Sequence, residues 1–85
     1  SLGASLARAR TDQNARGLDR RVETLLDSDE AQLPVRLRRA IHLLQSQRVG
    51  VAWQRLMRDL LYWNHPDRFV QKEWARDYFA SASSA

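Results

Sequence analysis

The 85 residues of this chain suffice for one domain at most, and because so short a chain buries only a little over ~60% of its unfolded surface, its core must be compact. The composition, 44% hydrophobic and 28% charged, is that of a globular protein rather than a disordered segment, and no run of residues approaches the roughly 18 apolar positions that a membrane span requires. The chain has no cysteine, which excludes disulfides and thiolate metal sites, and its net charge of +4 favours anionic partners.

Two helices are predicted in the first third of the chain. Residues 1–10 indicate a short, weak helix with Leu2 and Leu6 four positions apart, and a polar break follows over 11–17. Residues 18–27 form a stronger pattern, because their apolar residues recur at i, i+4, i+7 and i+8 and so fall on one face. The residues of that face are Leu18, Val22, Leu25 and Leu26.

The next two helices are predicted over 33–47 and 51–63. Pro34 suits the first turn of the earlier helix, and Gly50, just past its end, is the residue able to take left-handed geometry there. In the later helix the large apolar residues fall on one broad arc, which we expect to supply core area. These residues are Trp53, Leu56, Met57, Leu60, Leu61 and Trp63.

Pro66 separates the fourth helix from a fifth. It disfavours helical geometry at His65 and suits the first turn of a following helix, which we predict over 67–80. The tail over 81–85 is small and polar and is expected to fray. The residues of the fifth helix that recur every fourth position and face the core are Val70, Trp74 and Tyr78.

No stretch alternates apolar and polar residues between turn signals, so we expect no strand. Four to five short helices with brief connections predict an all-α fold, a small antiparallel bundle that forms a single helical domain over residues 1–85.

The sequence offers little for catalysis. It has no glycine-rich phosphate loop, no nucleophile elbow and no histidine pair at metal-ligand spacing. His65 beside Asp67 is the pattern of a base with an orienting acid, but Pro66 between them favours a helix cap and corner. We therefore predict no catalytic residue, no metal site and no cofactor, and hence a protein that is not an enzyme.

Basic residues are unevenly distributed. Between Glu30 and Asp59 there is no acidic residue, and a segregated basic surface of this kind attracts polyanions. The alternative is a solvated surface in an arginine-rich chain, which has thirteen arginines and one lysine. The arginines inside that window are Arg36, Arg38, Arg39, Arg48, Arg55 and Arg58.

Two cationic ladders flank the proline corner. Arg55 and Arg58 precede Tyr62 at spacing i, i+3 and i+7, and a second ladder with a four-residue spacing follows the corner. Because the two helices are consecutive, we expect both ladders to face one groove, where guanidinium groups contact phosphates and aromatic rings stack on unpaired bases. The second ladder consists of Arg68, Lys72 and Arg76, with Phe79 beside it.

Local ion pairs are the alternative for the ladders, namely Arg55 with Asp59, and Lys72 or Arg76 with Glu73 or Asp77. Phe69 lies opposite Val70 and Trp74 on the predicted helix, so we expect a neighbouring helix or another molecule to cover it. The predicted nucleic-acid-binding residues are Arg38, Arg39, Arg55, Arg58, Arg68, Lys72 and Arg76, with Arg36 and Arg48 as secondary candidates.

The second half of the chain carries a linked pattern, LP-x2-LR-x-A followed by LL-x-W-x-HPDR-x-VQ-x2-WAR-x-Y. This pattern resembles the CasB family, the small subunit of the type I-E CRISPR surveillance complex called Cascade. The residues that carry the resemblance are Leu33, Pro34, Leu37, Arg38, Ala40, Leu43, Leu44, Trp53, Leu56, Asp59, Leu60, Leu61, Trp63, His65, Pro66, Asp67, Arg68, Val70, Gln71, Trp74, Ala75, Arg76 and Tyr78.

The resemblance implies an all-helical, non-enzymatic subunit that is present in two copies. Because the sequence has neither a candidate membrane span nor a signal-peptide pattern, we expect it to be cytoplasmic. Its partners would be single-stranded DNA, the hybrid of guide RNA and target, and other Cascade subunits, with no membrane involved. Chains of this family are longer, so we expect this one to be the C-terminal half of a small-subunit protein. Because the chain opens at Ser1 rather than at Met, we also expect a fragment or a processed product.

A J-domain, the Hsp70 co-chaperone module, is the alternative resemblance. His65-Pro66-Asp67 matches its corner, and Arg55 and Arg58 lie on the preceding helix. J-domains continue with a loop and a long helix, however, whereas a helix is predicted here directly after the tripeptide, and the chain ends before such a loop would fit.

Overall fold

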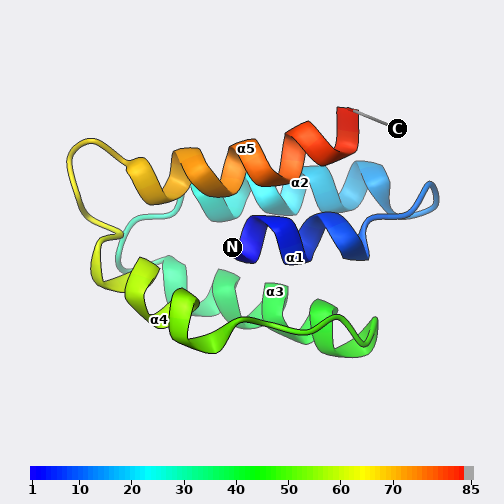
Figure 1. Ribbon diagram of the computed structural model, residues 1–85, viewed down its shortest axis with the longest axis horizontal. Coiled ribbons are helices and arrows are strands. Elements are labelled where there is room, and N and C mark those ends of the chain that lie inside the picture. Colours follow the sequence, from blue (N-terminus) through cyan, green and yellow to red (C-terminus); the bar gives the residue numbers. More distant parts are fainter. Residues whose placement is uncertain (84–85) are drawn as a thin grey trace.

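The computed structural model describes the backbone of residues 1–83 and the side chains of residues 1–80. Within this part of the chain there are helices and no strand, and they form an antiparallel bundle (Figure 1), which confirms the predicted all-α class. None of these helices has the length and apolar character of a membrane span. The helices are α1 (Leu2–Ala9), α2 (Ala15–Leu26), α3 (Leu33–Ser46), α4 (Trp53–Leu61) and α5 (Phe69–Ser83).

The helices α1 and α2 connect the two sides of the bundle, because each packs against both α3 and α5. In Figure 1, α5 lies along one side with α1 and α2 next to it, and α3 and α4 lie along the other side. The loop between α4 and α5 is at the same end of the bundle as the loop between α2 and α3, and the loop between α1 and α2 is at the opposite end (Figure 1).

The corner between α4 and α5 differs from the sequence prediction. The fifth helix begins at Phe69 rather than at residue 67, so Pro66 lies in a turn and not in the first helical turn. Arg68 explains the delay, because its φ of 53° is left-handed and interrupts the helical path immediately before α5. The helix extends through Ser83, beyond its predicted end at residue 80, and residues 84 and 85 of the tail lie outside the described part.

The end of α3 also uses an arginine where a glycine was predicted. Arg48, with φ of 57°, takes the left-handed position after the helix. The N–H of Arg48 donates to Gln45 O at 3.1 Å and that of Val49 to Leu44 O at 2.9 Å, the paired bonds of a Schellman end. Gly50 has no positive φ, so its predicted role as the left-handed residue is wrong.

The core is centred on the inner face of α5. Val70, Trp74 and Tyr78 are at most 2% exposed, which confirms the four-residue pattern read from the sequence. Apolar residues of every other helix pack with them into one cluster. The buried apolar residues contributed by the other helices and the α4–α5 connection are Leu2, Leu6, Ala9, Leu18, Val22, Leu25, Leu33, Leu44, Leu56 and Trp63.

A polar triad formed by Arg10 at the end of α1, Asp19 on α2 and Tyr78 on α5 closes one side of this core. The hydroxyl of Tyr78 donates to Asp19 Oδ1 at 2.5 Å, and Arg10 Nε donates to the same oxygen at 3.0 Å. These hydrogen bonds, Arg10's first and Tyr78's second, lower the pKa of Asp19, whereas burial and the nearby carboxylate raise the pKa of Tyr78. Tyr78 is therefore held as a neutral donor inside the bundle.

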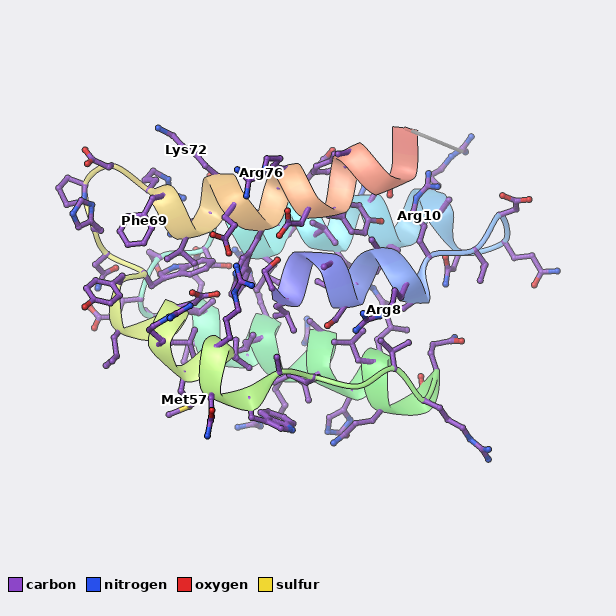
Figure 2. The ribbon with its side chains drawn as sticks, viewed as in Figure 1. Arg8, Arg10, Met57, Phe69, Lys72 and Arg76 are labelled. Carbon is purple, nitrogen blue, oxygen red and sulfur yellow. The ribbon has the colours of Figure 1, made fainter. Side chains whose placement is uncertain are left out.

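The helix α4 is only half covered, which corrects the prediction for its apolar arc. Leu56 and Trp63 are buried, but Trp53, Met57 and Leu61 are 52%, 63% and 81% exposed. Figure 2 shows Met57 projecting away from the bundle. The arc is wider than the surface that the rest of the bundle offers to α4, so the side of the arc that carries Trp53 stays open to solvent.

At Gly3, α1 lies very close to the backbone of α5. A Cβ atom at Gly3 would lie 2.8 Å from Trp74 Cα and closer still to the Trp74 carbonyl oxygen. Gly17, in contrast, has no atom within 4 Å of the position of such a Cβ. The absence of a side chain at Gly3 is what lets α1 pack directly on the backbone of α5.

We expect Gly3→Ala to lower the free energy of unfolding by about 1–3 kcal/mol, because the new methyl group forces α1 away from α5. The matched variant Gly17→Ala lies on an open face of α2 and should raise it by up to about 1 kcal/mol through helix propensity. Urea unfolding followed by circular dichroism measures both changes. Equal effects of the two substitutions would contradict the close approach.

Candidate nucleic-acid interface

A groove between α2 and α3 gathers most of the basic side chains of these two helices. Its apolar floor includes Leu18, Val22 and Leu25, which belong to the core. No carboxylate is among the residues that line it. The basic residues that line this groove, which we call the α2–α3 groove, are Arg20, Arg21, Arg36, Arg38, Arg39 and His42.

Four of these arginines are exposed and have no partner among the residues whose side chains are described. Among residues 1–80, the side chains of Arg20, Arg21, Arg38 and Arg39 form no ion pair within 4.0 Å and donate no hydrogen bond. Arg38 and Arg39 were predicted from the sequence, but Arg20 and Arg21 were not. Their contribution depends on how α2 packs against α3, for which the sequence carries no local signal.

Arg36 has a structural role instead. Its Nη1 donates to Thr24 O at 3.1 Å, to Ser28 Oγ at 3.1 Å and to Gln32 Oε1 at 3.3 Å. These bonds place a guanidinium at the C-terminal end of α2, where the helix dipole favours a positive charge. Arg36 is thus less available to an external anion than its neighbours on α3.

Arg68 acts on the same helix end from the opposite side. Its Nη2 donates to Leu26 O at 2.8 Å. The indole Nε1 of Trp63, at the end of α4, donates to Ser28 O just beyond the helix at 3.0 Å. The last turn of α2 contains no basic residue, so side chains from α3 and from the connection between α4 and α5 satisfy these carbonyls.

The two ladders do not share the groove expected between α4 and α5. Arg68 and Lys72 line a hollow between α2 and α5, and no residue of α4 is among those that line it. Glu23 and Asp27 line the same hollow, so its charge is mixed. The prediction of one common groove for both ladders is therefore wrong, because α5 turns Arg68 and Lys72 toward α2.

Arg55, on α4, contacts α5 through Glu73. Its Nη2 is 2.5 Å from Glu73 Oε1, and this pairing raises the pKa of Arg55. Glu73 thus pairs with Arg55 rather than with Lys72 or Arg76. Asp59, the partner expected for Arg55, is buried and accepts a hydrogen bond from Trp74 Nε1 at 2.9 Å.

The remaining predicted residues are exposed at separate places. Arg58 lies on α4, Arg48 follows α3, and Arg76 projects from α5 (Figure 2). Arg76 Nε is 3.6 Å from Asp77 Oδ1, which confirms one of the local pairs that the sequence allowed. The pKa of Asp77 is lowered chiefly by the hydrogen bond that the Ser1 hydroxyl donates to it at 2.6 Å.

The corner itself presents three rings, which we call the aromatic corner. Tyr62 and Phe69 have ring centroids 5.7 Å apart, and His65 and Phe69 5.0 Å apart. Phe69 contacts these two rings and is still 44% exposed, so neighbouring residues cover it only in part.

His65 and Asp67 are arranged as a turn rather than as a catalytic pair. The backbone N–H of Asp67 donates to His65 Nδ1 at 3.1 Å, whereas the Asp67 carboxylate stays 3.9 Å away. This bond closes the corner on itself, as predicted from Pro66. In the described part of the chain no group of three or more metal-ligating side chains comes together.

Comparisons with known proteins show what this chain is similar to. The family model described as CRISPR-associated protein Cse2 matches residues 1–79. A CRISPR-associated protein Cse2 from Thermus thermophilus is 38% identical over 85 residues, covering 98% of this chain and 48% of that protein. The crystal structure of M. ruber CasB superposes with a TM-score of 0.92 at 36% identity, covering 99% of this chain and 48% of that one.

These matches confirm the CasB resemblance read from the linked pattern. The family match includes His65-Pro66-Asp67, so that corner belongs to the same pattern and the J-domain alternative is not favoured. The chain spans about half the length of the relatives that it matches.

We expect Glu73→Gln to strengthen binding to a single-stranded oligonucleotide by about two- to five-fold at low salt, because Arg55 loses the carboxylate that neutralises it. Fluorescence anisotropy measures the affinity. Asp12→Asn, an exposed carboxylate in the loop at the opposite end of the bundle (Figure 1), makes the same change in net charge. An equal gain from both variants would mean that only net charge matters and would contradict a local role for Arg55.

Proposed function

This chain belongs to the CRISPR-associated Cse2 family, and from that membership we propose that it is the C-terminal half of a small subunit of a type I-E CRISPR surveillance complex, Cascade. In this role it serves antiviral defence in the cytoplasm without catalysing a reaction. Its partners are nucleic acid, other Cascade subunits and a second copy of the small subunit.

The α2–α3 groove is the observation that carries this proposal. Its wall holds five guanidinium groups and an imidazole, with no carboxylate to compete for them. Phosphate oxygens accept charge-assisted hydrogen bonds from guanidinium groups and release counterions when they do so. Because four of the arginines have no internal partner, they can bind phosphate without first breaking a protein contact.

The mode of binding follows from the same side chains. We expect the guanidinium groups of the groove to contact phosphates rather than base edges, so that binding by the groove is independent of the base sequence. In a guide-directed complex, base pairing reads the sequence while protein contacts to the backbone of the hybrid and to the displaced strand favour strand exchange. A basic surface that contacts phosphates rather than base edges is consistent with this separation between base pairing and protein contacts.

The structure changes the relative weight of the binding residues proposed from the sequence. Arg36, which donates three hydrogen bonds within the fold, and Arg55, which is ion-paired with Glu73, contribute least, and unpaired residues contribute most. The main binding residues that we propose are Arg20, Arg21, Arg38 and Arg39, followed by Arg58, Arg68, Lys72, Arg76 and Arg48.

A salt titration of the 85-residue chain with oligothymidylate tests the proposal. We expect log K to fall linearly with log salt, and Arg38→Gln with Arg39→Gln to reduce the slope by about 0.7 for each arginine. Circular dichroism should show an unchanged fold, because both side chains are exposed.

Arg16→Gln is the control, since Arg16 is exposed on α2 but does not line the groove. Loss of the same slope in Arg16→Gln would assign binding to net charge rather than to the groove. Absence of any binding by the unmodified chain at low salt would contradict autonomous nucleic-acid binding.

A further inference from the structure

We propose that the aromatic corner is a stacking site for unpaired bases, so that this chain binds single strands in preference to duplexes. The inference rests on the proposed nucleic-acid function and adds to it the form of nucleic acid that is recognised. The aromatic corner consists of Tyr62, His65 and Phe69.

The rings of the aromatic corner are accessible although they contact one another. Tyr62 is 49% exposed and Phe69 is 44% exposed. The Tyr62 and Phe69 rings are tilted by 47°, and the His65 ring meets Phe69 edge-on at 69°. Tilted and edge-on contacts do not cover both faces of a ring, so ring surface remains open for stacking.

The backbone holds these rings in place. The N–H of His65 donates to Tyr62 O, and that of Arg68 donates to His65 O, both at 3.0 Å. Arg68 is left-handed without being glycine, and such strain is retained only where the surrounding structure fixes it. Phe69 follows directly, so its ring is set at the corner before any ligand arrives.

Basic residues lie close to the rings in the sequence on both sides of the corner, beside one exposed carboxylate, that of Asp67, which is 3.9 Å from His65 Nδ1. Arg58 lies one helical turn before Tyr62, and Arg68 and Lys72 lie on either side of Phe69 in the sequence. Figure 2 shows Phe69 and Lys72 near the same end of α5. Rings can stack on the bases of a single strand while neighbouring cations contact its phosphates. A purely apolar partner would contact the rings but not the cations.

The preference for single strands follows from base availability. Bases inside a duplex or a hybrid are already stacked on their neighbours, so they cannot reach an aromatic side chain without being pulled out. Bases of a displaced strand are free to do so. The α2–α3 groove therefore accepts either form, and the aromatic corner adds affinity only for the unpaired one.

The test compares two probes of the same charge, oligothymidylate of about 15 nucleotides and an abasic oligomer of equal length. We expect Phe69→Leu and Tyr62→Leu each to weaken oligothymidylate binding by about 5- to 100-fold, in line with the loss of one stacked base. Binding of the abasic oligomer should stay unchanged, since the phosphate contacts are kept.

Two control variants test whether any loss of affinity is due to the loss of an aromatic ring. Tyr62→Phe retains a ring and should retain affinity, and Leu61→Ala removes an 81% exposed side chain next to Tyr62 and should have no effect. Urea unfolding of each variant verifies the fold. If Phe69→Leu disturbs the start of α5, the comparison of Tyr62→Leu with Tyr62→Phe still tests the stacking site.

The outcomes separate the two proposals. Failure of the unmodified chain to bind either oligomer would overturn the proposed function, and this inference with it. Equal affinity for both oligomers, or equal losses on both in the ring variants, would overturn the stacking site alone. Unchanged oligothymidylate binding in Phe69→Leu and Tyr62→Leu would also overturn it and would leave the rings to a protein partner.

Discussion

The C-terminal end of α2 is the point on which the arrangement of this chain depends. A helix leaves its last carbonyl groups without intrahelical partners, and a buried end needs donors from elsewhere. Here Thr24 O, Leu26 O and Ser28 O accept from Arg36, Arg68 and Trp63, which belong to three different segments. A single helix end thereby fixes α3, the end of α4 and the start of α5 relative to one another.

That constraint divides the basic residues into two groups. Arginines drawn to the helix end, such as Arg36 and Arg68, have part of their hydrogen-bonding capacity used within the fold. Other arginines, such as Arg38 and Arg39 on α3, remain unpaired within the described residues and line the α2–α3 groove. Arg55 falls into the first group because Glu73 neutralises it. The number of basic residues in the sequence therefore overstates the charge that is free to bind phosphate.

The sequence predicts the helices and the core of α5 well, because a four-residue period around Trp74 is a local property of one segment. It fails where the answer depends on packing between segments. Trp53 lies on a predicted apolar arc, yet the bundle covers only one side of α4 and leaves it 52% exposed. The left-handed turn after α3 falls on Arg48 rather than on Gly50, because the hydrogen bonds from the helix end decide the position. The contribution of Arg20 to the α2–α3 groove cannot be predicted from the sequence, because it depends on how α2 packs on α3.

Hydrogen exchange of the three indole N–H groups, followed by NMR, tests directly whether the end of α2 holds the neighbouring segments in place. We expect the Trp63 indole, bonded to Ser28 O, and the Trp74 indole, bonded to Asp59, to exchange only on global unfolding. The Trp53 indole, in a side chain that is half exposed, should exchange rapidly and serves as an internal reference. Exchange of the Trp63 indole as fast as that of Trp53 would contradict this arrangement, because α4 would then not be tied to the end of α2.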